Sequence, residues 1–226
     1  MKTIDFTKYP MPRMRHHVNP TLYLPYESHH KRPYWYPPLI EQYTWSDNFA
    51  NSNPPTVLDI GCGRGGFLLQ YALDNPHINI LGLELRKQAV EWINGVIKGE
   101  SIENAAVFWY SAVNNLPFIE DNSIDTVFYF FPDPWHKKRH HKRRLFSTEF
   151  LTELDRVMKP DACLYLMTDV ETVDEYQQES INEHNIFTFR YCDNDEEWNL
   201  PRTDQEKFSL RKGIPYRRLI VTKKKK

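Results

Sequence analysis

Apolar residues change their spacing repeatedly along the chain from residue 55 onward. Runs such as 56–60, which lies between Pro55 and Gly61, have the length and aliphatic content of buried strands. In segments such as 85–97, apolar residues instead recur every three or four positions, as they do on one face of a helix. This alternation predicts an α/β fold with a doubly wound, mainly parallel, seven-stranded sheet. The expected strands are 56–60, 79–83, 106–110, 124–131, 163–167, 186–191 and 216–221, and the expected helices are 67–73, 85–97, 146–158 and 170–182.

Residues 1–50 show neither pattern. Prolines at positions 10, 12, 20, 25, 33, 37 and 38 prevent long helices, whereas the many aromatic residues argue against a disordered segment. We therefore expect residues 1–50 to form an arm that packs over a catalytic domain spanning 51–226. A short helix near 39–48 is expected at the end of the arm.

A glycine-rich loop follows the first expected strand. Gly61, Gly63 and Gly66 match the G-x-G-x-x-G pattern, which lets the backbone approach a dinucleotide or a related cofactor. Asp59, just before the loop, favours S-adenosylmethionine, because its carboxylate can meet the cationic amino-acid end of that cofactor. Glu84 ends the second strand, where an acid can hold ribose hydroxyls of either ligand. A strand–helix turn without a ligand is the remaining alternative.

One cationic segment stands out in a chain of net charge −1. Residues 136–144 hold six of the 29 lysines and arginines and no acid, which predicts contact with nucleic-acid phosphates. The segment follows Asp133 and Trp135 at the end of the fourth expected strand, where open α/β sheets bind ligands. The Trp135 ring offers a flat face for a purine. The alternatives are a solvated charged face, or a metal held by His136 and His140, which the neighbouring cations disfavour.

The remaining composition narrows the class of protein. Cys62, Cys163 and Cys192 are far apart and odd in number, so we expect buried free thiols and neither disulfides nor a zinc site. No apolar run reaches the length of a membrane span, and the first residues lack a secretory signal. We therefore expect a cytoplasmic protein without a metal or a membrane partner, either a monomer or a homodimer.

These motifs resemble a known family. The segment 130–144, which contains Phe-Pro-Asp-Pro-Trp followed by the cationic run, is similar to the F-P-D-P-W-x-K-K-R-H-x-K-R-R signature of the tRNA (guanine-N7-)-methyltransferases. The glycine loop, 166–169 and 203–206 match the pattern of that family in the same order, and 13–17 resembles its basic N-terminal segment. The resemblance implies a Rossmann-like class I methyltransferase fold, S-adenosylmethionine as cofactor, and a variable-loop guanine of tRNA as the substrate, converted to 7-methylguanosine.

The resemblance also assigns roles to individual positions. Ser111 stands where the family usually has Asp or Asn, Asp59 replaces a usual Glu, and Gln205 replaces a usual aromatic residue. The implied cofactor contacts are Asp59, Gly61, Gly63, Glu84, Ser111 and Asp133, and the implied substrate contacts are Lys137, Arg144, Asp169, Thr203, Asp204, Gln205 and Glu206.

Methylation of guanine N7 requires positioning rather than a base, because N7 carries a lone pair and no proton. Positive charge appears on the imidazole ring, so nearby carboxylates stabilise it electrostatically. Asp133 is the first candidate for this catalytic role and Asp169 the second, although Asp169 precedes an expected helix and could instead be its N-cap. Rival classes are a nicotinamide-dependent dehydrogenase, a methyltransferase for a small molecule or protein, and a non-catalytic RNA-binding module. The first two leave the cationic segment unexplained, and the third leaves the glycine loop unexplained.

Overall fold

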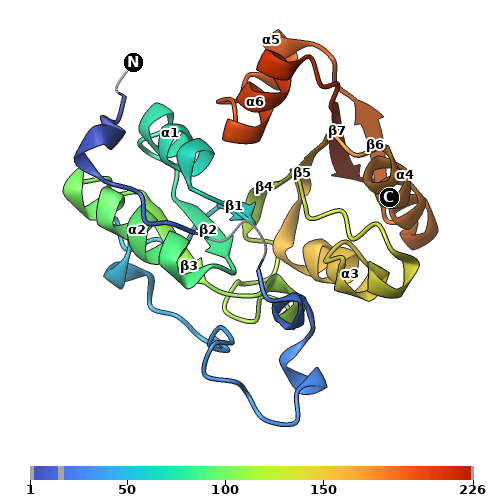
Figure 1. Ribbon diagram of the computed structural model, residues 1–226, viewed down its shortest axis with the longest axis horizontal. Helices are drawn as coiled ribbons and strands as arrows, with labels where there is room; N and C mark the ends of the chain where they lie inside the picture. Colours follow the sequence, from blue (N-terminus) through green and yellow to red (C-terminus); the bar gives the residue numbers. More distant parts are fainter. Residues whose placement is uncertain (1–2, 15–17, 225–226) are drawn as a thin grey trace.

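A computed structural model describes residues 3–14 and 18–224, except for the side chain of Lys138. Its described part contains one seven-stranded sheet in the order β3-β2-β1-β4-β5-β7-β6 (Figure 1). All neighbouring strands are parallel except β7, which runs antiparallel to β5 and β6. The predicted fold class and all of the predicted strands are confirmed. The strands are β1 (Val57–Ile60), β2 (Ile80–Glu84), β3 (Ala105–Trp109), β4 (Ile124–Phe130), β5 (Met158–Thr168), β6 (Phe187–Tyr191) and β7 (Arg217–Lys223).

The four predicted helices cover the two faces of this sheet. Helices α1 (Gly66–Asp74) and α2 (Lys87–Gly99) lie on one face, and α3 (Thr148–Val157) and α4 (Glu171–His184) lie on the other (Figure 1). Each pair buries its apolar side against the strands in a large hydrophobic cluster of its own, and a smaller third cluster forms around Trp198. Because the parallel strands share a direction, the loops after β1, β2, β4 and β5 meet at one edge of the sheet.

Two further helices were not predicted. The short α5 (Asp195–Trp198) and the longer α6 (Asp204–Lys212) lie between β6 and β7. Helix α6 has few apolar residues, so its hydrophobic periodicity is weak. Its ends nevertheless carry the usual signals, a Thr203–Glu206 capping box and a left-handed Gly213 at the C-terminus. These end signals could have identified α6 without any periodicity.

The expected helix near 39–48 is wrong. Only a 3-10 turn, η4 (Trp45–Asp47), forms there, because this part of the arm is anchored by aromatic packing rather than by helical hydrogen bonds. The rings of Tyr43 and Trp45 contact Phe108 of β3, with centroid distances of 4.6 and 6.1 Å. The connection from β3 to β4 carries only the 3-10 turn Ala112–Asn114, so the arm covers part of the sheet face that a helix would otherwise cover.

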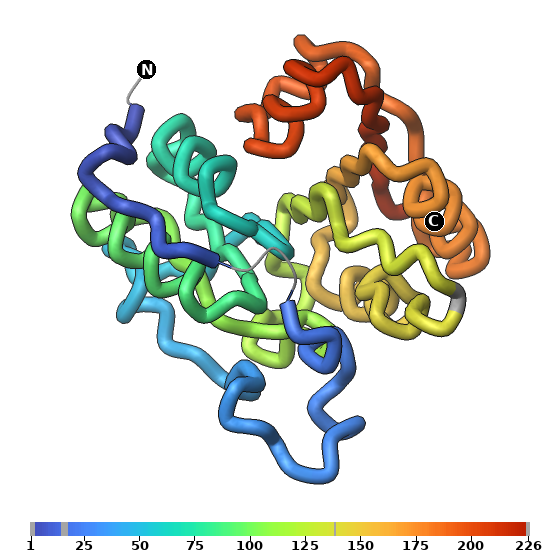
Figure 2. Tube along the Cα trace, viewed as in Figure 1, coloured from blue at the N-terminus to red at the C-terminus, as the bar shows by residue number. Residues whose placement is uncertain are grey.

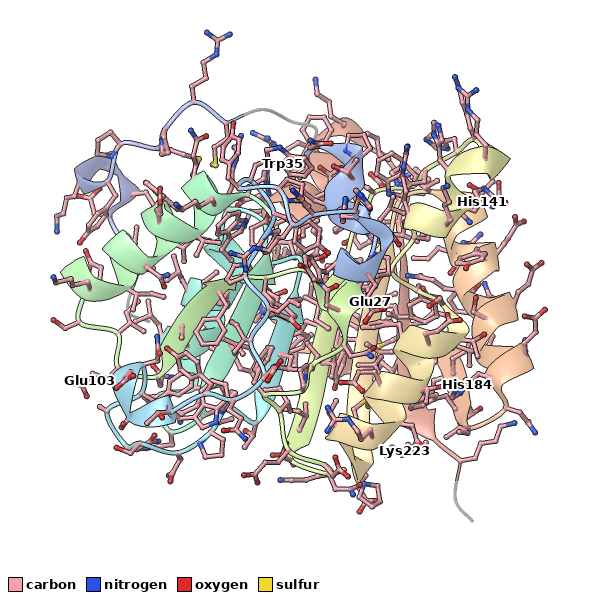
Figure 3. All side chains as sticks on the ribbon, turned by 90° about the horizontal axis from the view of Figure 1, so that it is seen from below. Glu27, Trp35, Glu103, His141, His184 and Lys223 are labelled. Atoms are coloured by element: carbon pink, nitrogen blue, oxygen red, sulfur yellow. The ribbon has the colours of Figure 1, made fainter. Side chains whose placement is uncertain are left out.

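The arm runs along much of the molecule before it reaches β1. Its start packs on α2, where Phe6 stacks on Trp92, and its later part passes the loops at the carboxyl ends of the strands (Figure 2). Figure 3 shows labelled Trp35 of the arm and His141 of the cationic segment at the upper edge of the sheet, opposite Glu103 near the start of β3. The middle of the arm and the cationic segment therefore lie at the ligand-binding edge, whereas the end of the arm lies at the opposite edge, where Ala50 N donates to Glu103 O.

The cysteines, the possible metal ligands and the helix lengths can also be compared with the expectations from the sequence. All three cysteines are free, with Cys62 and Cys192 buried, whereas Cys163 is half-buried, so the expectation of full burial is wrong for that residue. The described part of the chain holds no group of three or more His, Cys, Asp or Glu residues placed to bind a metal ion. Among the described helices, none has the length and apolar character required to cross a membrane.

Candidate active site

The glycine loop connects β1 to α1 through backbone that only glycine adopts easily. Gly61, Gly63 and Gly65 all have positive φ, at 77°, 65° and 73°. Gly65, the N-cap of α1, is the most restricted, because a Cβ there would lie 2.9 Å from the Ile93 side chain. At Gly61 a Cβ would meet nothing within 4 Å, so the loop leaves space on that side. The loop thus combines a tight turn with open backbone, as ligand binding by main-chain atoms requires.

Glu84, at the end of β2, holds the glycine loop through a hydrogen bond. Its Oε2 accepts a hydrogen bond from Gly63 N at 2.9 Å, and its Oε1 accepts one from Arg86 Nε at 2.9 Å. The carboxylate is nearly buried, so the ion pair with Arg86 and the bond to the loop offset the cost of burying its charge. The predicted cofactor residues Gly63 and Glu84 are therefore in direct contact.

Asp59 is buried beneath the loop without a full set of partners. It is 3% exposed, and none of the described groups hydrogen bonds to its Oδ2. Burial, and then the negative charge of Glu84, raise the pKa of Asp59 to about 8. A buried carboxylate that lacks a partner is costly, so this oxygen is suited to receive a cationic or hydrogen-bonding ligand.

The loop after β4 is strained at both ends of its Pro-Asp-Pro motif. Phe131 and Trp135 have φ values of 47° and 45°, which are rare for residues with side chains. Such conformations persist only where surrounding contacts impose them. Here Phe131 N donates to Met167 O at 2.6 Å, and Arg144 donates through Nε and Nη2 to Pro134 O at 3.1 and 2.9 Å. The loop presents Asp133 as an exposed carboxylate.

The cationic segment divides into two groups. Arg143 lies over the Trp135 ring at 4.9 Å, and Arg144 lies over the Tyr176 ring at 4.6 Å, so both guanidinium groups hold the loop and its surroundings. Lys137, Arg139 and Lys142 are exposed and face solvent. Arg144 thus has a local structural role, and its predicted contact with the substrate stays a prediction. One face of Trp135 is occupied by Arg143.

The side chain of Asp169, which follows β5, contacts helix α6. Both segments belong to the predicted substrate site. The Asp169 carboxylate accepts a hydrogen bond from Gln205 Nε2 at 2.9 Å. The alternative role of Asp169 as a helix N-cap is wrong, because the N-cap of α4 is Val170. A side chain at Gly66 would lie 3.3 Å from the Asp204 carboxylate, so the start of α6 also lies beside the start of α1.

Two of the four predicted residues on this segment point inward instead. Glu206 is fully buried and accepts from Arg218, from Tyr216 Oη at 3.0 Å and from Thr203 N at 3.2 Å. Thr203 accepts from Glu206 N at 3.0 Å and completes the capping box. Their side chains hold α6 in place, and this leaves Asp204 and Gln205 nearer the surface.

The arm supplies two contacts that the sequence reasoning missed. Ser111 Oγ donates to Leu22 O at 2.8 Å, so Ser111, an implied cofactor contact, is covered by the arm. Tyr23 Oη donates to the Asp133 carboxylate, and its ring packs edge-on against Trp135 at 4.9 Å. The only sequence signal for this contact was the dense aromatic content of the arm, which does not indicate the contacted residue.

Comparison with known proteins identifies the family. The family model described as "Putative methyltransferase" matches residues 53–218. A tRNA (guanine-N(7)-)-methyltransferase of Prochlorococcus marinus is 34% identical, with 75% of this chain and 78% of that protein aligned. A second, from Lactobacillus johnsonii, is 31% identical, with 79% and 80% aligned.

The chain belongs to the tRNA (guanine-N(7)-)-methyltransferase family.

Solved structures agree on the fold of this methyltransferase. A 16S rRNA methyltransferase, KamB, superposes with a TM-score of 0.55 over 78% of this chain and 89% of that protein, at 16% identity. A SAM-dependent methyltransferase from Aquifex aeolicus superposes with a TM-score of 0.52 over 75% and 81%, at 17% identity. The predicted family, enzyme class and cofactor, S-adenosylmethionine, are confirmed, and the dehydrogenase alternative is excluded.

The residues of the methyltransferase fit this cofactor. The glycine loop offers main-chain atoms and open space at Gly61, and Asp59 holds a buried carboxylate oxygen that has no hydrogen-bond partner among the described residues. Glu84 stands beside the loop. The individual roles of Asp59, Glu84, Ser111 and Asp133 toward the cofactor stay predictions.

Proposed function

We propose that this methyltransferase transfers a methyl group to N7 of a variable-loop guanine in tRNA, in the cytoplasm, and forms 7-methylguanosine. The observation that carries the proposal is the placement of Asp133. It stands exposed on a strained loop between the glycine-loop side of the sheet and an exposed cationic segment. The relatives named tRNA (guanine-N(7)-)-methyltransferase support the substrate class.

The cofactor side of the site is formed by the loops after β1 and β2. S-adenosylmethionine supplies an electrophilic methyl group when it is bound. Gly61 and Gly63 offer backbone contacts, Asp59 offers a carboxylate to its cationic amino-acid end, and Glu84 offers a carboxylate to its ribose. Ser111 follows the neighbouring strand β3 on the same side, where its hydroxyl is bonded to Leu22 O of the arm.

The substrate side is formed by the loop after β4 and by the contact of Asp169 with α6. Guanine must be exposed from the tRNA structure and held with N7 in line for transfer, which is a proximity task. The Asp133 carboxylate stabilises the positive charge that develops on the imidazole ring. Asp169 can accept from guanine N1–H and the exocyclic amine, a donor pair that adenine lacks. Asp204 and Gln205 border this position, and Thr203 and Glu206 support it from below.

Phosphate contacts are assigned to the exposed cations of the 136–144 segment. Lys137, Arg139 and Lys142 face solvent next to the loop that carries Asp133. Each can neutralise one phosphate of the tRNA backbone, and such contacts position the substrate without reading its sequence. Arg144 contributes by fixing Pro134, the neighbour of Asp133.

Substituted transcripts test the proposed position. An unmodified tRNA is prepared with 7-deazaguanine in place of the variable-loop guanine, and the control transcript carries the same replacement at another guanine. We expect the first transcript to accept no methyl group and the control to accept as much as the unsubstituted tRNA, because 7-deazaguanine lacks the attacking nitrogen. Undiminished methylation of the first transcript would rule out the variable-loop N7.

A further inference from the structure

Tyr23 is the residue of the arm that enters the active site. It ends the 3-10 turn η2 (Pro20–Tyr23), more than 100 positions before the loop that it contacts. Its hydroxyl donates to Asp133 Oδ2, and its ring meets the Trp135 ring at 4.9 Å with an interplanar angle of 78°. The side chain therefore touches both functional residues of the Pro-Asp-Pro-Trp motif.

The loop that Tyr23 contacts requires external support. Phe131 and Trp135 lie in left-handed backbone regions on either side of Asp133. Such backbone conformations are unfavourable for residues with side chains, so the surrounding contacts must hold the loop in this form. Arg144 fixes the Pro134 carbonyl and Arg143 covers Trp135, but neither guanidinium group hydrogen bonds to the Asp133 carboxylate. Among the described residues, the hydroxyl of Tyr23 is the hydrogen-bond donor to that carboxylate.

The arm holds Tyr23 firmly on both sides. Leu22 is buried and its carbonyl accepts from Ser111 Oγ, while the Leu24 carbonyl accepts from Tyr36 Oη at 2.8 Å. Asn19 caps η2 through a bond from Thr21 N at 3.2 Å. A tyrosine anchored in this way loses little conformational entropy when it binds Asp133, as a positioning group requires.

We propose that Tyr23 is a positioning residue of the methyltransferase, whose hydroxyl orients the Asp133 carboxylate and whose ring supports Trp135 during methyl transfer. The inference rests on the proposed function. Burial, followed by the charge of Asp133, raises the pKa of Tyr23 well above its usual range. The phenol therefore stays protonated and remains a donor at neutral pH. The charge of Glu84 acts on the pKa of Tyr23 in the same direction.

Two substitutions separate the contributions of the hydroxyl and the ring. Tyr23→Phe removes the hydrogen bond to Asp133 and keeps the edge contact with Trp135, whereas Tyr23→Leu removes both. Tyr26→Phe is the matched control, because Tyr26 lies in the same arm and packs against Tyr36 without touching the loop. We expect Tyr23→Phe to lower kcat roughly tenfold, the usual worth of a hydrogen bond to a charged group. Its thermal midpoint and its tRNA affinity should match those of Tyr26→Phe.

A double-mutant cycle with Asp133→Asn decides whether Tyr23 acts through that carboxylate. Single-turnover rates are measured for Tyr23→Phe, Asp133→Asn and the double variant. If Tyr23 positions Asp133, the Phe substitution should have almost no effect in the Asp133→Asn background. Equal effects in both backgrounds would overturn the proposal and assign Tyr23 to a separate role. An unchanged or faster Tyr23→Phe enzyme would also overturn it. If the wild-type enzyme transfers no methyl group to tRNA, the proposed function fails, which is distinguishable from either result.

Discussion

Asp59 combines three properties that rarely occur together in one side chain. It is buried, one of its oxygens has no hydrogen-bond partner in the described part of the chain, and its pKa is raised to about 8 by burial and by Glu84. The ordinary value is 3.8, so the unfolded chain releases this proton at a lower pH than the folded protein does. The folded state therefore loses stability as the pH rises from about 4 to about 8.

Asp59→Asn tests this linkage without a ligand. The variant keeps the size of the side chain and removes its ionisation, so the stability decline assigned to Asp59 should vanish. We expect the thermal midpoint of the variant to gain on that of the wild type as the pH is raised from about 5 to about 8. Parallel midpoint curves for the two proteins over this range would contradict the raised pKa.

Asp133 is the residue on which the chemical argument depends. Asp133→Asn keeps its shape and removes the charge that stabilises the methylated guanine. We expect kcat to fall by roughly 100-fold while the tRNA affinity stays within about twofold, because the exposed cations bind the phosphates. Asp125→Asn is the control, since Asp125 lies near the opposite end of the same strand and pairs with Lys159 at 2.8 Å. Equal turnover of the two variants would remove Asp133 from the mechanism.

At the scale of elements, helix α6 brings a segment with little hydrophobic patterning into the site. Its capping box and the buried pair of Glu206 with Arg218 fix the helix, and Gln205 then reaches Asp169. Helix stability and site geometry are thus connected through a single cap.

Thr203→Ala measures that connection. Loss of an N-cap costs about 1 kcal/mol, so the free energy of unfolding should fall by that amount. Ser147→Ala, which removes the cap that accepts from Phe150 N on α3, is the matched control with a similar cost. We expect Thr203→Ala to lower kcat/KM severalfold more than Ser147→Ala, because only α6 positions Gln205 beside Asp169. Equal losses would mean that α6 matters only for stability.

Most of the sheet and of the cofactor side could be predicted from local sequence. The run 56–60 and the glycines after it specify a strand and a tight turn through hydrophobicity and backbone freedom, which are properties of adjacent residues. Helix α6 was missed because its hydrophobic periodicity is weak, although the local capping signals at Thr203 and Gly213 mark its ends. The Tyr23–Asp133 contact was missed for a different reason, since no local pattern pairs residues 110 positions apart.

The whole molecule has an uneven distribution of charge. Its net charge is −1, yet the 136–144 segment carries six cations and stands at the ligand-binding edge of the sheet. This arrangement predicts tRNA binding that depends on salt through a few residues rather than through the whole surface. It also predicts that neighbouring cations differ, because Arg143 and Arg144 are engaged with the loop.

Salt titrations of tRNA binding distinguish the cations that contact phosphates from those that hold the loop. Lys137→Ala and Lys142→Ala should each flatten the log–log salt dependence of tRNA affinity by roughly 0.7–0.9, one phosphate contact apiece. Lys98→Ala, in the last turn of α2, is the control and should leave the slope unchanged. Arg144→Ala should lower turnover as well, because Pro134 loses its guanidinium partner. If the two lysine variants keep the slope of the wild type, tRNA binds elsewhere.

The identity of the methylated nucleoside tests the account most directly. The purified enzyme is incubated with unmodified tRNA and S-adenosylmethionine that carries a labelled methyl group, and the tRNA is then digested to nucleosides. The account predicts that the label appears as 7-methylguanosine with the wild-type enzyme and is strongly reduced with Asp133→Asn. Label on a different nucleoside, or on protein alone, would contradict it.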